Sequence, residues 1–324
     1  MRHHLARYGA LLGALAIVAG FALALPETFL TFRNWINISQ QVSMLAVIAF
    51  TMTVVMVTGD FDLSVGSMAS LSGVVAAVAF QAGAPVLLGV AAALAVGLIG
   101  GALNGLVVAR LGILPFVATL ATLTIFSGAA FLISDGRTIF GRDIPASFGA
   151  FARGGLPLGT WDGRPLTLPA LTLVALAVFA LVWLMLGRSR PGRHLYAIGS
   201  NRQAAHLAGI RVTQLRIAAF ATAGLGAALG GLMYASRVAS ANPTQGAGLM
   251  LDAIAAVFLG MALIAEPQPR VSGTLLGVLI LGVLDNGLTQ LNVGSYVREV
   301  VVGLVLLAAV VSARLSTHGN PGER

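Results

Sequence analysis

Residues 85 to 109 read Pro-Val-Leu-Leu-Gly-Val-Ala-Ala-Ala-Leu-Ala-Val-Gly-Leu-Ile-Gly-Gly-Ala-Leu-Asn-Gly-Leu-Val-Val-Ala, with no charged side chain. An α-helix rises about 1.5 Å per residue, so about 20 such residues cross the hydrocarbon core of a bilayer. This stretch therefore predicts a transmembrane helix. Similar apolar runs predict further helices near residues 8–26, 35–58, 64–81, 113–133, 166–187, 214–236, 248–265, 271–291 and 295–312. The predicted fold class is an all-α polytopic membrane protein with about ten transmembrane helices in a single domain, 1–324.

The composition agrees with a membrane location. Hydrophobic residues make up 57% of the 324 residues and charged residues 9%, whereas about 25% charged is typical of soluble domains. A chain this apolar would expose large hydrophobic patches in water. Disorder, a coiled coil and a secreted disulfide scaffold are excluded. The continuous runs also argue against a β-barrel, whose strands alternate.

Two residue types are absent from the chain. Without Cys, thiolate metal sites, disulfides and cysteine nucleophiles are excluded. All 19 basic residues are Arg, and a Walker A phosphate loop needs its Lys, so this chain cannot bind ATP in that way. The net charge of +8 fits membrane insertion better than nucleic-acid binding, because the arginines cluster at span ends.

The arginines also predict an orientation. The loop 188–216 carries six arginines and no acid, which is typical of a cytoplasmic loop. With ten spans, both termini then lie in the cytoplasm, and the loop 134–166 lies outside.

Two predicted spans of opposite direction share a pattern. Aligning Asn104 with Asn286 also pairs Gly100 with Gly282, Gly105 with Gly287, Leu106 with Leu288 and Gly112 with Gly294. Similar sequence running in opposite directions indicates an inverted repeat. Glycine pairs four residues apart predict close helix packing at Gly101/Gly105, Gly226/Gly230 and Gly273/Gly277.

Thr58-Gly-Asp-Phe-Asp-Leu-Ser-Val-Gly-Ser67 is the most unusual stretch in the chain. Its two acids, Asp60 and Asp62, lie between apolar spans, where a buried charge costs at least about 2.5 kcal/mol. One interpretation is that Asp60, Asp62 and Ser64 cap the following helix, whose N-terminus favours acids. The other is that they line a transport path or a gate.

The cytoplasmic loop contains a second motif, which spans Gly192 to Gly209. Ser200 and Gln203 have the spacing of a capping box, and Gly209 suits the position after a helix. The small residues Ala204 and Ala205 would let another protein approach closely. The short helix is thus interpreted either as a surface helix on the membrane or as a docking helix for a cytoplasmic partner.

Polar side chains recur on single faces of the predicted spans. At i, i+3 and i+4 spacing they form helix faces that hydrogen-bond either a polyhydroxy solute or a neighbouring helix. The candidates for a substrate path are Asn37, Gln40, Gln41, Asp60, Asp62, Ser64, Asn104, Thr119, Thr122, Asn286, Thr289 and Gln290.

These motifs together resemble the permease subunits of bacterial ABC importers for monosaccharides, of the ribose, arabinose and xylose type. The matching segments are 59–67, 103–110 (Leu-Asn-Gly-Leu-Val-Val-Ala-Arg), 115–124 (Pro-Phe-Val-Ala-Thr-Leu-Ala-Thr-Leu-Thr), 133–137 (Ile-Ser-Asp-Gly-Arg) and 192–209. They follow the family order over roughly residues 35–312. The form of the first and third segments is most similar to the arabinose branch.

The resemblance implies a division of labour in the bacterial cytoplasmic membrane. Two permease copies would form the pathway, a cytoplasmic ATPase would bind the ATP, and a periplasmic binding protein would deliver the sugar. No cofactor or metal is implied for this chain. The docking segment, about 188–214, matches the ATPase contact, with Gly199, Ser200, Asn201, Gln203, Ala204, Ala205 and Gly209 as candidate docking residues.

One segment departs from the family pattern. Where a glycine-rich stretch is usual, the chain has Glu266-Pro-Gln-Pro269, and proline stiffens a turn because it fixes φ. Other functions also stay open: an importer for a branched-chain amino acid or a signalling furanose, and a proton-coupled transporter using Asp252 or Asp285. An intramembrane enzyme is disfavoured because no nucleophile–base pair or metal-ligand spacing is present.

Overall fold

The computed structural model describes residues 2–161, 163–264, 268–294, 296–297, 299–304 and 307. The chain folds as two compact units. The first unit comprises Met1–Val42 and Ile254–Arg324, and the second comprises Ser43–Ala253. Each unit is described by itself.

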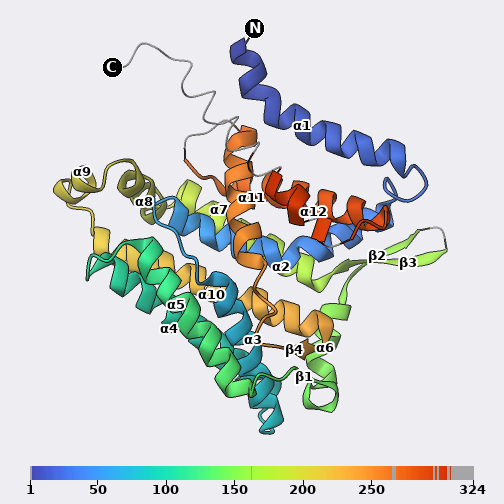
Figure 1. Ribbon diagram of the computed structural model, residues 1–324, viewed down its shortest axis with the longest axis horizontal. Helices are drawn as coiled ribbons and strands as arrows, with labels where there is room; N and C mark the ends of the chain where they lie inside the picture. Colours follow the sequence, from blue (N-terminus) through green and yellow to red (C-terminus); the bar gives the residue numbers. More distant parts are fainter. Residues whose placement is uncertain are drawn as a thin grey trace. The chain divides into compact units, whose positions relative to one another are not determined.

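Long apolar helices dominate both units, as the hydropathy predicts (Figure 1). Six are long and apolar enough to cross a membrane, counted among the described residues: α2 (Phe32–Met56), α4 (Val86–Ala109), α5 (Pro115–Ser134), α7 (Ala170–Arg188), α10 (Val212–Val238) and α12 (Val271–Gln290). Three further predicted spans correspond to α1 (Arg2–Ala24), α3 (Val65–Gln81) and α11 (Leu249–Ile264). The all-α polytopic prediction is confirmed. The tenth span, 295–312, lies largely outside the described residues.

The loops carry short elements. The predicted outer loop contains β1 (Ile139–Phe140), a 3-10 turn (Gly141–Asp143), α6 (Ala146–Arg153) and the hairpin of β2 (Gly155–Trp161) with β3 (Arg164–Pro169). The predicted cytoplasmic loop contains α8 (Arg190–Ser200) and α9 (Arg202–Leu207). After α10, β4 (Ser240–Ala241) pairs antiparallel with β1.

A glycine seam joins α4 and α10 in the second unit. A Cβ on Gly101 would lie 2.3 Å from the Phe220 carbonyl oxygen, and one on Gly105 would lie 2.6 Å from the Ile217 Cα. The two backbones therefore touch directly, as the glycine spacing predicts. In the first unit, α11 and α12 meet in the same way, because a Cβ on Gly277 would lie 2.0 Å from the Ala256 carbonyl oxygen.

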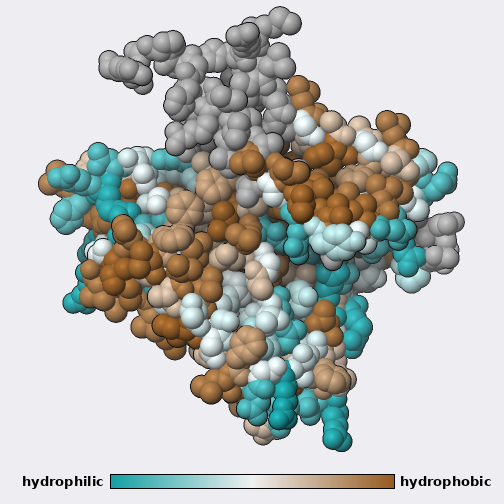
Figure 2. Space-filling view, viewed as in Figure 1, coloured by the Kyte–Doolittle hydropathy of each residue, from teal (hydrophilic) through white to brown (hydrophobic). Residues whose placement is uncertain are grey.

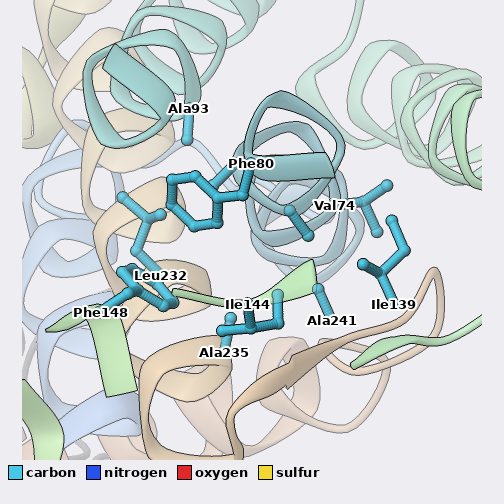
Figure 3. Close-up of a cluster of buried hydrophobic side chains, with 11 residues drawn as sticks. Val74, Phe80, Ala93, Ile139, Ile144, Phe148, Leu232, Ala235 and Ala241 are labelled. Carbon is cyan, nitrogen blue, oxygen red and sulfur yellow. The ribbon is translucent and has the colours of Figure 1, made fainter. Parts of the chain in front are cut away.

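A buried apolar cluster closes one end of the second unit. Figure 3 shows side chains of α3, α10 and the segment 139–148 pointing toward one another. The rings of Phe80 and Phe148 lie 5.1 Å apart, and Ser236 donates to the Phe148 carbonyl at 2.6 Å. Helices α8 and α9 lie at the opposite end of this unit (Figure 1). The predicted outer and inner loops thus occupy opposite ends, as alternating spans require.

The outward faces of α4 and α5 are apolar. Leu98, Ile99, Leu120, Ile125 and Leu132 are all exposed. Figure 2 shows brown surface over these helices and teal surface over α9. Apolar outer faces of this kind suit contact with lipid.

Candidate functional site

The turn 57–64 between α2 and α3 buries two acids. Asp60 and Asp62 are each 1% exposed. Gly59, at φ +79°, adopts the left-handed conformation that lets the chain reverse after α2. Buried carboxylates are costly unless other groups pair with them, so the partners of each acid define its role.

Asp60 is the centre of a buried ion-pair cluster. Arg216 of α10 donates Nε to Oδ2 at 2.7 Å and a guanidinium NH2 to Oδ1 at 3.0 Å. Arg202 of α9 donates to Oδ1 at 3.0 Å, and the Thr58 hydroxyl donates to Oδ2 at 3.0 Å. Both carboxylate oxygens therefore have arginine partners. Asp60 is thus an ion-pair partner, in addition to being a candidate for the substrate path.

Neither arginine of this cluster is predicted from the sequence as a partner of Asp60. They lie 142 and 156 residues from Asp60 in the chain. A signal did exist, because the turn 57–64 and the loop 188–216 fall on the same predicted side of the membrane. Two acids next to an arginine-rich loop on that side are the pattern expected for ion pairs.

Asp62 has only neutral partners. Its Oδ1 accepts from the Ser64 backbone N–H at 2.9 Å, from the Ser64 hydroxyl at 2.6 Å and from Asn104 Nδ2 at 3.4 Å. It thus holds the chain as it enters α3, close to the capping interpretation, whereas the Ser64 side chain makes no cap bond. Burial raises the pKa of Asp62, and the hydrogen bonds from Ser64 and Asn104 lower it less.

Two oxygens in the group formed by Asp62, Ser64 and Asn104 have no protein partner. They are Asp62 Oδ2 and Asn104 Oδ1, both fully buried. Asn104 Nδ2 also donates to the Ser64 hydroxyl at 2.8 Å, which ties α4 to the start of α3. Three of the predicted candidates, Asp62, Ser64 and Asn104, are therefore brought together.

The α8–α9 junction lies directly on the turn 57–64. A Cβ on Gly199 would lie 1.9 Å from the Val57 carbonyl oxygen. Asn201 then caps α9, since its side chain accepts from the Ala204 N–H at 2.9 Å. The predicted capping box is wrong, because Ser200 ends α8 and its hydroxyl donates to a carbonyl of that helix, that of Tyr196. Gly209, at φ +80°, follows α9 as predicted.

Not all of the predicted docking residues of α9 are exposed. Gln203 and Ala204 are exposed, but Ala205 is 4% exposed. Ala204 and Ala205 differ in exposure because neighbouring helix positions point about 100° apart. Leu207, which the sequence analysis missed, is 80% exposed and supplies the apolar part of the exposed face of this helix.

Amides of α2 and α12 meet in the first unit. Asn34 Nδ2 donates to Asn286 Oδ1 at 3.0 Å, and Gln290 Nε2 donates to Asn34 Oδ1 at 3.0 Å and to Asn286 Oδ1 at 2.8 Å. Gln41 hydrogen-bonds Asp285. Three predicted path residues, Gln41, Asn286 and Gln290, therefore also connect helices.

The remaining path candidates lie apart from these clusters. Asn37 is exposed, and Gln40 is half-buried. Thr119, Thr122 and Thr289 donate their hydroxyls to carbonyls of their own helices.

A non-helical segment, residues 242–248, packs along α3 in the second unit. Gly246 donates its N–H to the Ser70 hydroxyl at 2.9 Å, and its carbonyl lies against Gly66. The Gln245 side chain donates to the Gly231 carbonyl of α10 at 3.4 Å. Irregular backbone between spanning helices is tolerated where protein groups satisfy its polar atoms, as here. The sequence analysis missed this segment, although Asn-Pro-Thr-Gln-Gly is typical of a break.

The chain has extensive similarity to known transport proteins. It matches the family described as branched-chain amino acid transport system / permease component over residues 34–310. It is 40% identical to the ribose import permease protein RbsC of Escherichia coli (strain K12) over 92% of this chain and 91% of that protein. It is 38% identical to RbsC of Bacillus subtilis (strain 168) over 95% and 92%. It is 36% identical to the L-arabinose transport system permease protein AraH of E. coli (strain K12) over 95% and 90%. No solved structure matches significantly.

Proposed function

Because the chain belongs to the branched-chain amino acid transport system / permease component family, we propose that it is the membrane-spanning subunit of an ATP-driven importer for a monosaccharide. It is a transport component and not an enzyme. The observation that carries the proposal is the extent of the similarity, 40% identity over 92% of this chain, to a ribose import permease. The long apolar helices supply the multi-pass membrane domain that such a subunit needs.

The proposed substrate is a pentose. Relatives named for ribose are 40% and 38% identical to this chain, and a relative named for L-arabinose is 36% identical. More specifically, we propose arabinose as the pentose, because the sequence motifs favour the arabinose branch. Ribose and arabinose differ in hydroxyl stereochemistry, so a binding protein that hydrogen-bonds each hydroxyl separates them by affinity.

The proposed partners are a cytoplasmic ATPase, a periplasmic sugar-binding protein and a second copy of this chain. The absence of Lys supports a separate ATPase, because a Walker A loop needs one. Its docking surface is the exposed face of α9, formed by Gln203, Ala204 and Leu207, in the arginine-rich loop. In this orientation the loop 188–216 and both termini lie in the cytoplasm.

The proposed substrate path uses polar side chains in each unit. In the first unit these are Asn37, Gln40, Gln41, Asn286, Thr289 and Gln290. In the second they are Asp62, Ser64, Asn104, Thr119 and Thr122. The two buried oxygens of Asp62 and Asn104 support this choice, since sugar hydroxyls both donate and accept hydrogen bonds. Asp60 also belongs to the proposed path in the second unit, where Arg216 and Arg202 bind its two carboxylate oxygens. The segment Glu266–Pro269, where the chain departs from the family pattern, lies partly outside the described residues, which do not include 266 and 267.

Uptake in cells tests the proposal. A strain without pentose uptake receives this chain, its ATPase and its sugar-binding protein, and accumulation of labelled ribose, arabinose, galactose and leucine is measured. We expect accumulation of a pentose, which is lost when the Walker A lysine of the ATPase is replaced. Accumulation of leucine alone would instead support the branched-chain amino acid alternative. Pentose accumulation that persists with the inactive ATPase would contradict ATP-driven import.

A further inference from the structure

The only charged side chain of α9 that enters the buried part of the second unit, among the residues described, is Arg202. Its guanidinium donates to Asp60 Oδ1 at 3.0 Å and to the Thr58 carbonyl at 3.5 Å. Both acceptors belong to the turn 57–64. The short helix α9 is otherwise exposed, apart from Ala205.

The two arginines on Asp60 are not equivalent. The Arg216 side chain is 7% exposed and binds both carboxylate oxygens, so its ion pair with Asp60 is buried and bidentate. The Arg202 side chain is 47% exposed and binds one oxygen. Loss of the Arg202 bond leaves Asp60 paired with Arg216 and costs little desolvation. The Arg202–Asp60 ion pair can therefore form and break while Asp60 stays paired with Arg216.

Contacts continue from the turn to the middle of the unit. The Gly199 backbone presses on the Val57 carbonyl, so the turn and the α8–α9 junction meet without an intervening side chain. The turn leads directly into α3, where Gly66 packs on Gly246 of the non-helical segment. The Arg202–Asp60 ion pair and the backbone contacts of Gly199 and Gly66 thus link α9 to the segment 242–248. A displacement of α9 can reach that segment through these contacts.

We propose that Arg202 and Asp60 are positioning residues that transmit the movement of α9 to the turn 57–64 and hence to α3. This inference rests on the proposed function, in which an ATPase contacts α9. Nucleotide-dependent movement of the ATPase shifts α9, and the Arg202–Asp60 ion pair together with the Gly199–Val57 contact moves the start of α3. The role of Arg202 is to couple the two movements and not to bind the ATPase.

The test compares Arg202→Ala with Arg193→Ala, another exposed arginine of the same loop. The complex of this chain with its ATPase and binding protein is reconstituted in liposomes, and sugar moved per ATP hydrolysed is measured. We expect Arg202→Ala to keep ATPase co-purification and ATP hydrolysis but to lower that ratio about tenfold, a typical coupling between sites. Arg193→Ala should leave the ratio unchanged, and Arg202→Lys should retain most of it, because an ammonium also pairs with Asp60.

A ratio for Arg202→Ala equal to that of the unchanged protein would overturn the proposal. Loss of ATPase co-purification in Arg202→Ala would also overturn it, since Arg202 would then belong to the docking surface. A complex of unchanged chains that moves no sugar with ATP would instead defeat the proposed function. Asp60→Asn provides a second test. The double variant Asp60→Asn with Arg202→Ala should move no less sugar per ATP than Asp60→Asn alone, because both changes break the same ion pair.

Discussion

Asp60 and Asp62, the two acids of the turn 57–64, show how hydrogen-bonding partners determine whether a buried carboxyl group is stabilised in its charged form. Asp60 and Asp62 lie two residues apart and are equally buried, but only Asp60 has cationic partners. Asp62 receives hydrogen bonds from Ser64 and Asn104 on one oxygen, while the other oxygen has no protein partner. Burial therefore raises the pKa of Asp62. The two carboxyls therefore differ in their surroundings: Asp60 is held by ion pairs, whereas Asp62 has only neutral hydrogen-bond donors.

The raised pKa of Asp62 predicts a dependence of stability on pH. A folded-state pKa above the ordinary value of 3.8 means that the folded protein holds a proton that the unfolded chain releases. The stability that this proton supplies is present at low pH and is lost as pH rises through the folded-state pKa. Asp62→Asn stays neutral, so its unfolding temperature relative to the unchanged protein should increase as the pH rises above 3.8.

The measurement is thermal unfolding in detergent at several pH values. At the upper pH we expect Asp62→Asn to be more stable by about 1–3 kcal/mol, the cost of burying a charged group with an unpaired oxygen. Gly128→Ala, a change that involves no titratable group and meets no atom within 4 Å, provides the control and should show no such trend. A difference that is constant with pH, or that decreases as pH rises, would contradict the assignment of a buried proton to Asp62.

At the scale of elements, the sequence predicts helices better than it predicts what the helices contact. Hydropathy placed α4, α5 and α10 within a few residues of their observed bounds, because crossing a bilayer demands long apolar helices. The predicted N-cap of α9 is one residue off, since both Ser200 and Asn201 are good capping residues. The segment 242–248 was missed because its partners, Gly66 and Ser70, are set by tertiary packing.

The glycine seam between α4 and α10 gives a matched pair of variants. Gly101→Ala places a Cβ 2.3 Å from the Phe220 carbonyl oxygen, so the helices must separate, at about 1–3 kcal/mol of stability. Gly128→Ala on α5 meets no atom within 4 Å, and Ala favours a helix over Gly. Unfolding temperatures should therefore fall for Gly101→Ala and stay level or rise for Gly128→Ala. Equal shifts in the two variants would refute close packing at Gly101.

The exposed face of α9 predicts how the ATPase is held. Leu207 is 80% exposed, and removing an apolar anchor from an interface typically costs 2 kcal/mol or more, about a thirtyfold loss of affinity. Leu207→Asp should therefore reduce ATPase co-purification while the unfolding temperature stays unchanged. Leu158→Asp, an equivalent change on the exposed β2 strand, should leave co-purification intact. Normal co-purification of Leu207→Asp would remove Leu207 from the docking surface.

At the scale of the whole molecule, the arginine distribution predicts which loops share a side of the membrane. The structure groups the turn 57–64 with α8 and α9, and it groups α6 with β4 at the other end of the second unit. This grouping agrees with alternating spans. Which end faces the cytoplasm follows from charge alone and stays a prediction.

Single-cysteine labelling measures that orientation directly, because the chain has no native Cys. A cysteine at Ala150, exposed in α6, should react with an impermeant reagent added to the outside. A cysteine at His206, exposed in α9, should react only after the membrane is opened. The reverse pattern would invert the topology and place α9 out of reach of a cytoplasmic ATPase.

Transport by the purified components tests the central claim of ATP-driven pentose import most directly. Liposomes carrying this chain and its ATPase, with ATP on the ATPase side and the sugar-binding protein on the opposite side, are supplied with labelled ribose or arabinose. The account predicts movement of a pentose against its gradient that requires ATP, the ATPase and the binding protein. Movement by this chain alone, driven by a proton gradient without ATP, would contradict it.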